Sequence, residues 1–248
     1  MNDEQPTGDP VDEERSPGGS QIFRHAAARG WQPPQGEECI AQISAHVQRH
    51  LGPVAWVFHE IMSDLVHIDV HVVKPTPEQP YVRLVTSGMS DLPMTTPANT
   101  EVPRFAELML TLPPDWRTDA DSFKDEAWYW PVRLLKTLAR LPHQYQTWLG
   151  WGHTIPHGDP ATPLADNVGF SGAIVLPSMT APKAFETLDI DEDKRITFYA
   201  VWPLFPGEMD FKLKKGTNDL IDCFEKHQVT DAVDPARKDA TRRRFRFW

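Results

Sequence analysis

Apolar residues recur with the period of a helix near the start of the chain. Between residues 37 and 51 they stand three or four positions apart, which places them on one helix face: Ile40, Ile43, Val47 and Leu51. Gly52 and Pro53 follow at once, and both residue types end helices. We therefore predict an amphipathic helix over residues 37–51 with one buried face.

Four later stretches have the residue types and lengths of β-strands. They cover residues 54–61, 65–73, 81–86 and 105–112. In the second stretch, aliphatic residues alternate with His67, Asp69 and His71. Because successive side chains of a strand point to opposite faces, the alternation predicts one covered face and one face open to water. Together the four stretches predict a mainly antiparallel sheet.

The middle of the chain has a helical pattern interrupted by prolines. Ser122 and Asp125 have the spacing of a capping box at a helix start. An apolar stripe follows, made of Leu134, Leu135, Leu138 and Leu141. Pro131 and Pro142 each remove a backbone donor, so we expect them to divide the stretch into consecutive helices.

The C-terminal half adds two strands and one helix. The strands are predicted over residues 170–176 and 196–202, and Thr217 is expected to cap a helix that ends near His227. Helices interrupt the strands irregularly, without the strict alternation of a doubly wound sheet. The prediction is an α+β fold with a mainly antiparallel sheet flanked by helices.

Composition divides the 248 residues into a body and two unusual ends. Hydrophobic residues make up 40% and charged residues 24%, which are values of a folded globular protein. Residues 1–20 are acidic, rich in Pro and Gly, and lack apolar periodicity, so we expect a disordered leader. Residues 237–248 form a basic, aromatic tail. The folded domain is therefore predicted over residues 21–236.

The charge distribution bears on possible partners. The net charge is −10, and the acidic leader and basic tail cancel each other, so the acidic excess belongs to residues 21–236. An acidic body repels phosphate backbones, which argues against nucleic acid as a partner. No apolar run is long enough to span a membrane and no signal sequence starts the chain, so we expect a cytoplasmic protein without a membrane partner.

The stretch His67, Asp69 and His71 is the sharpest candidate for chemistry. These residue types bind zinc and related ions, and alternation along a strand places all three on one face. They would suit a metal-dependent hydrolase. Alternate side chains of a strand lie about 7 Å apart, however, so the two histidines are separated by about twice that distance. We therefore expect neither a metal ion nor another cofactor, and the hydrolase is the alternative interpretation.

Two further segments have unusual residue types. The segment 87–91 reads as a tight turn whose Ser and Asp side chains bond the backbone. The segment 148–153 places Trp148, Trp151 and His153 beside two glycines. Indole rings occur both in cores and at binding hot spots, and the sequence leaves both interpretations open.

Several stretches together resemble the suppressor of fused domain family, particularly its shorter bacterial members. They are HIDV (67–70), LVTSGMSD (84–91), PM (93–94), AELM (106–109), LPPDW (112–116), WP (130–131), LLK (134–136), GHT (152–154) and EMDFKLKKGT (208–217). The resemblance extends over residues 35–236, and its specificity lies in the order and coverage of these motifs. It implies a single suppressor-of-fused-like α+β domain.

The same resemblance implies a function without catalysis. Members of the family bind other proteins, and bacterial members include proposed immunity proteins that neutralise toxins. The expectation is therefore a bacterial immunity protein whose partner is another protein, a toxin. The animal members have a second domain for which this chain is too short, so their partner does not carry over. The expected partner-binding residues are Gly88, Met89, Ser90, Asp91, Trp148, Trp151 and His153.

Overall fold

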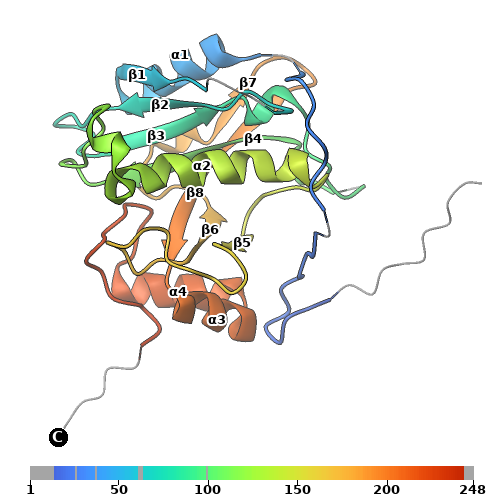
Figure 1. Ribbon diagram of the computed structural model, residues 1–248, viewed down its shortest axis with the longest axis vertical. Helices are drawn as coiled ribbons and strands as arrows, with labels where there is room; N and C mark the ends of the chain where they lie inside the picture. The colour runs from blue at the N-terminus through green and yellow to red at the C-terminus, as the bar shows by residue number, and fades with distance from the viewer. Residues whose placement is uncertain (1–13, 26, 37, 61–63, 99, 243–248) are drawn as a thin grey trace, which may run out of the picture.

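The computed structural model describes residues 14–25, 27–36, 38–60, 64–98 and 100–242. One eight-stranded sheet forms the centre, with helices on both faces (Figure 1). In chain order the elements are α1 (Ile40–Leu51), β1 (Val54–Phe58), β2 (Asp69–Val73), β3 (Val82–Ser87), η1 (Met89–Asp91), β4 (Phe105–Leu112), η2 (Ser122–Lys124), α2 (Glu126–Gln144), β5 (Thr154–Pro156), β6 (Gly172–Leu176), η3 (Lys183–Phe185), β7 (Thr187–Asp189), β8 (Arg195–Leu204), α3 (Pro206–Lys215) and α4 (Thr217–His227).

The sheet has the strand order β1-β2-β3-β4-β8-β6-β5, and the short β7 pairs with one end of β8. Strands β1 to β4 form an antiparallel meander, as the sequence predicts. Strand β8 pairs with β4 in parallel and with β6 and β7 antiparallel. Its ten residues therefore join the N-terminal meander to the C-terminal strands.

Helix α2 covers one face of the sheet (Figure 1). It packs Leu135, Leu138 and the fully buried Trp130 on the meander. The prediction that prolines divide this segment is wrong, because α2 runs through Pro131 and Pro142. Pro131 cannot donate to the carbonyl oxygen four residues earlier, and the side chain of Asn167 donates to that oxygen instead, at 3.1 Å.

The start of α2 also differs from the prediction. Ser122 lies in the 3₁₀ turn η2 and does not begin the long helix. Asp125 is the N-cap, since its carboxylate accepts a hydrogen bond from the backbone N–H of Ala127 at 2.9 Å. The capping residue is thus the second member of the predicted box.

Helices α1, α3 and α4 contribute to the core on the other face. Helix α1 begins three residues later than predicted and buries Ile43, Val47 and Leu51. The expectation of one water-exposed face for β2 is wrong, since Asp69 is 1% and His71 0% exposed. The cause is the second helical layer, which covers the polar face as α2 covers the apolar one.

Both chain ends approach the body where they are described. Residues 1–13 of the predicted leader and 243–248 of the predicted tail lie outside the described residues. Within residues 14–20, Gly18 donates its N–H to the carbonyl oxygen of Leu213 in α3, at 2.8 Å. At the other end, Arg237 forms an ion pair with the buried Glu208, and Ala240 is buried. No helix within the described ranges is long and apolar enough to cross a membrane.

Candidate functional site

The predicted binding turn at residues 88–91 is buried. Gly88 has a φ of +104°, and a Cβ there would stand 1.9 Å from the carbonyl oxygen of His67, so only glycine fits. Met89 and Ser90 are 0% exposed and Asp91 is 6% exposed. The side chains of this turn that were expected to contact a partner are therefore enclosed within the protein.

The turn closes over a fully buried carboxylate. Glu107 of β4 accepts hydrogen bonds from the N–H groups of Gly88 and Ser90 and from the hydroxyls of Ser90 and Thr86. Burial raises the pKa of Glu107. Burial, and secondarily the charge of Glu107, raise the pKa of Asp91 to about 7. These side chains hold the turn onto the sheet, in agreement with the structural interpretation of the motif.

The loop at residues 148–153, between α2 and β5, combines packing with exposure. The rings of Trp148 and His153 have centroids 4.0 Å apart, and Phe23 packs on His153 at 5.4 Å. Trp151 is 50% exposed. Gly152 donates its N–H to the carbonyl oxygen of Val175 at 2.8 Å, which fixes the loop on the sheet. Trp148 and His153 therefore pack against neighbouring rings, whereas Trp151 is half exposed.

His153 is an uncharged member of this aromatic loop. Burial, followed by the charge of Lys212, lowers the pKa of His153 to about 4. The imidazole is therefore neutral at pH 7 and packs as an aromatic ring. The loop and the turn are linked through neighbouring residues. The backbone carbonyl oxygen of Met89 in the turn bonds His143 of α2, and the N–H of Leu149 in the loop donates to the sulfur of Met94. Of the two predicted segments, the loop is the one with an exposed large side chain.

The residues proposed for a hydrolase separate into two environments. His71 is enclosed, accepts or donates one hydrogen bond with the hydroxyl of Ser87 at 2.9 Å, and burial lowers its pKa to about 4. His67 and Asp69 remain together, with His67 Nε2 3.0 Å from Asp69 Oδ1. His59, which no sequence motif indicated, places its Nδ1 2.8 Å from Asp69 Oδ2. The structure thus replaces His71 by His59 in the predicted cluster.

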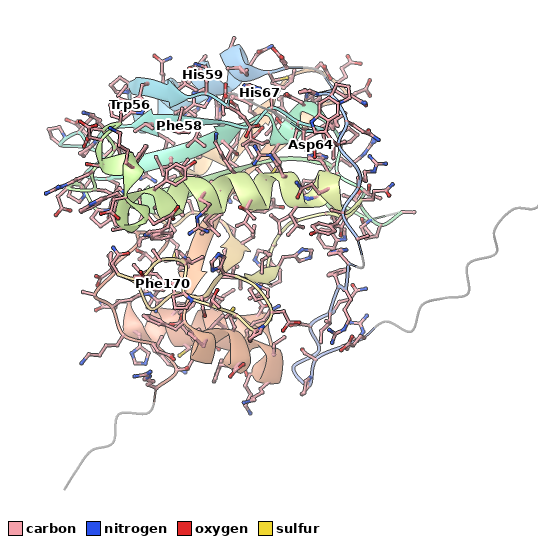
Figure 2. The ribbon with its side chains drawn as sticks, viewed as in Figure 1. Trp56, Phe58, His59, Asp64, His67 and Phe170 are labelled. Carbon is pink, nitrogen blue, oxygen red and sulfur yellow. The ribbon has the colours of Figure 1, made fainter. Side chains whose placement is uncertain are left out.

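A cleft lies beside the edge strand β1. It has a volume of about 760 Å³, and its walls include Trp56, Phe58, Trp116 and Phe123. Figure 2 shows Trp56 and Phe58 close together on the outer part of the sheet. The ammonium group of Lys74 lies 5.1 Å from the centre of the Trp56 ring. The cleft therefore combines aromatic side chains with the basic Lys74 and Arg117 and the acidic Asp115 and Asp119.

Comparison with known proteins identifies the family of this fold. The family model of suppressor of fused protein (SUFU) matches residues 64–238, which is more than half of the sequence. The chain belongs to the suppressor of fused family. No curated protein matches the SUFU-family chain in sequence. The predicted family and the predicted α+β fold with a mostly antiparallel sheet are confirmed.

Solved SUFU structures share this fold at low sequence identity. A putative SUFU homolog from Neisseria gonorrhoeae superposes with a TM-score of 0.61 at 16% identity, covering 82% of this chain and 97% of that one. A Sufu–Fu complex gives 0.55 at 14% identity, with coverages of 84% and 93%. Drosophila Suppressor of Fused gives 0.54 at 14% identity; 85% of this chain is covered, but only 52% of the Drosophila protein.

Proposed function

We propose that this SUFU-family chain is a non-catalytic protein-binding domain whose contact surface centres on the loop at residues 148–153. The observation that carries the proposal is the half-exposed indole of Trp151 on a loop fixed to the sheet. One of the similar solved structures is a complex between Sufu and Fu, so that relative binds a protein partner. The fold is therefore compatible with partner binding.

The loop suits recognition because its backbone is fixed and its other rings are packed. Trp148 and His153 pack on each other and on Phe23, and Gly152 next to Trp151 bonds to Val175. A loop that is already ordered loses less conformational freedom on binding. Trp is also enriched among the residues that dominate binding energy at interfaces. The turn at residues 88–91 has a supporting role in this proposal, since its side chains are buried.

The partner is proposed to be a toxin that this protein neutralises in a bacterial cell. The resemblance to short bacterial members supports this role, because some of them are proposed immunity proteins. The acidic body adds support from charge, since the net charge of the chain is −10. Toxins that act on nucleic acids are often basic, and opposite charges accelerate association and favour the correct partner.

The test is binding to the product of the gene immediately upstream. Trp151→Ala should weaken affinity by about 2 kcal/mol or more, which is roughly a 30-fold rise in Kd. Met179→Ala is the matched control, because Met179 is 62% exposed and lies on a different loop. Isothermal titration calorimetry gives the affinities, and thermal melting reports whether each variant keeps its fold.

Three results would contradict parts of the proposal. An unchanged Kd for Trp151→Ala would remove the loop from the contact surface. Loss of binding with Trp56→Ala alone would move that surface to the cleft beside β1. Absence of any interaction, together with failure to protect cells that produce the toxin, would refute the immunity role.

A further inference from the structure

Three potential metal ligands meet where β1 ends and β2 begins. His59 follows the last residue of β1, Asp69 is the first residue of β2, and His67 precedes it by two positions. Each offers one ligand atom, and the three atoms all lie within 4.8 Å of one another. Figure 2 labels both histidines at this end of the sheet.

Strand pairing explains why residues distant by ten positions converge. Phe58 pairs with Val70 across the antiparallel β1–β2 ladder, so the next residue, His59, comes opposite Asp69. His67 lies on the same side as Asp69 because alternate residues of an extended chain share a face. Just before it, Leu65 has a φ of +64°, and the turn there redirects the chain into β2.

The carboxylate at the centre of the cluster is fixed by its surroundings. Asp69 is 1% exposed, and its oxygens lie within hydrogen-bond distance of both imidazoles and of the backbone N–H of Glu60. Arg140 and Lys136 both pair with the side chain of Glu60, and Lys136 also interacts electrostatically with Asp69. The Asp69 oxygens lie 2.8 and 3.0 Å from the nitrogens of the two histidines.

Access to the cluster comes from the histidine side. The side chain of His59 is 69% exposed and that of His67 is 32% exposed, whereas Asp69 is enclosed. An ion approaching from solvent would thus meet the imidazoles first and the carboxylate behind them. Three protein ligands with one open side are the arrangement of zinc sites that keep a water in the fourth position.

We propose that His59 Nδ1, His67 Nε2 and one oxygen of Asp69 bind a Zn²⁺ ion. Two imidazoles and a carboxylate form a donor set that suits zinc. Mg²⁺ and Ca²⁺ prefer ligands that are all oxygen, so this set disfavours them. Metal–ligand distances of about 2.0–2.2 Å require tetrahedral ligand separations of about 3.4 Å. The observed separations of 2.8 and 3.0 Å from Asp69 therefore have to open by about half an ångström.

The His59 side chain can move to open these separations, since it is the most exposed of the three ligand side chains. The ion takes the place of the hydrogens that now bridge imidazole and carboxylate. A neutral imidazole then carries its hydrogen on the other ring nitrogen, whereas an imidazolium releases one proton. This ligand set differs from the one suggested by sequence. His67 and His71 are too far apart to share an ion, whereas the hairpin brings His59 to His67.

The test uses the full chain after dialysis against a chelator. Calorimetric titration with ZnCl₂ should show one equivalent bound, and MgCl₂ should show none. Co²⁺ should give the intense visible absorption of a tetrahedral site, which zinc then abolishes. His59→Gln and His67→Gln should each weaken zinc binding by at least about tenfold, because even the loss of residues that merely support ligands costs about 10–100-fold.

His227→Gln is the control, because His227 is an exposed histidine at the end of α4. It should bind zinc as the wild type does, and the melting temperature of each metal-free variant should match the wild type. Zinc binding that survives either ligand replacement overturns the proposed site. Failure of the wild-type protein to bind one equivalent also overturns it and leaves a hydrogen-bonded cluster without a metal.

Discussion

Replacing Arg237 with Met should show how strongly the C-terminal segment stabilises the domain. The guanidinium donates to both oxygens of Glu208 and, at 2.8 Å, to the carbonyl oxygen of Pro203. It also lies 5.0 Å from the ring centre of Phe170 and 4.7 Å from that of Phe205. Figure 2 labels Phe170 in the part of the molecule next to α3 and α4.

The magnitude follows from the burial of the partner. Glu208 is 0% exposed, so removing Arg237 leaves a carboxylate in the core without its counter-charge. Such a loss typically costs about 3–5 kcal/mol. Two backbone N–H groups, of Phe205 and Ala240, still bond the carboxylate. We therefore expect a loss of about 3 kcal/mol in the free energy of unfolding, at the lower end of that range.

Urea denaturation of four proteins measures this loss: the wild type, Arg237→Met, Glu208→Gln and the double variant. Met keeps much of the apolar stem that packs on the phenyl rings, so the substitution removes the charge of the guanidinium and its hydrogen bonds, including the one to Pro203. The double variant should be more stable than the sum of the single losses predicts, since neither partner is left alone. If Arg237→Met lowers the free energy of unfolding by less than about 1 kcal/mol, the pair is no stronger than an ion pair at the surface. That result would refute the argument from the burial of Glu208.

Two other substitutions test the buried turn. The pKa of Asp91 is raised to about 7 from 3.8, so between pH 4 and pH 7 the folded state holds a proton that the unfolded state has released. The free energy of unfolding should therefore fall as the pH rises from about 4 to 7. Between pH 5 and pH 8 this decline should amount to about 2.5 kcal/mol, since about two pH units below 7 each contribute about 1.4 kcal/mol. Asp91→Asn should remove it in urea titrations at these two pH values, and parallel curves for the two proteins would contradict this. Gly88→Ala should cost at least about 2 kcal/mol in thermal melting, because its Cβ meets the carbonyl oxygen of His67; an unchanged melting temperature would show that the turn can relax.

Local patterns in the sequence were sufficient for α1 and for strands β1–β4, β6 and β8, whereas β5, β7 and α3 were not predicted. Hydrophobic runs bounded by Gly and Pro report on residues adjacent in sequence, and β4 spans Phe105–Leu112 as predicted. The burial of β2 was not predictable in this way. Whether Asp69 and His71 face water depends on a second helical layer, which comes from segments on both sides of the strand in sequence. The continuity of α2 through Pro131 similarly depends on Asn167, which lies 36 residues beyond the proline.

The candidate sites show the same division. The loop at residues 148–153 was recognised by its residue types, but the sequence did not indicate which of the two indoles would be exposed. The burial of Asp91 could not be predicted from the sequence, because Glu107, over which the turn closes, belongs to another strand. His59 has no recognisable motif around it, and only strand register brings it to Asp69.

The parallel pairing of β4 with β8 has a consequence for how the chain folds. The meander β1 to β4 consists of neighbours in sequence, so it can form early, whereas β8 begins 83 residues after β4 ends. Until β8 arrives, the open edge of β4 presents the unpaired backbone groups of a strand that contains three Leu residues and one Met. Folding is therefore expected to include a slow closing step. Partly synthesised chains that end before Arg195 should associate through this edge more readily than the complete protein.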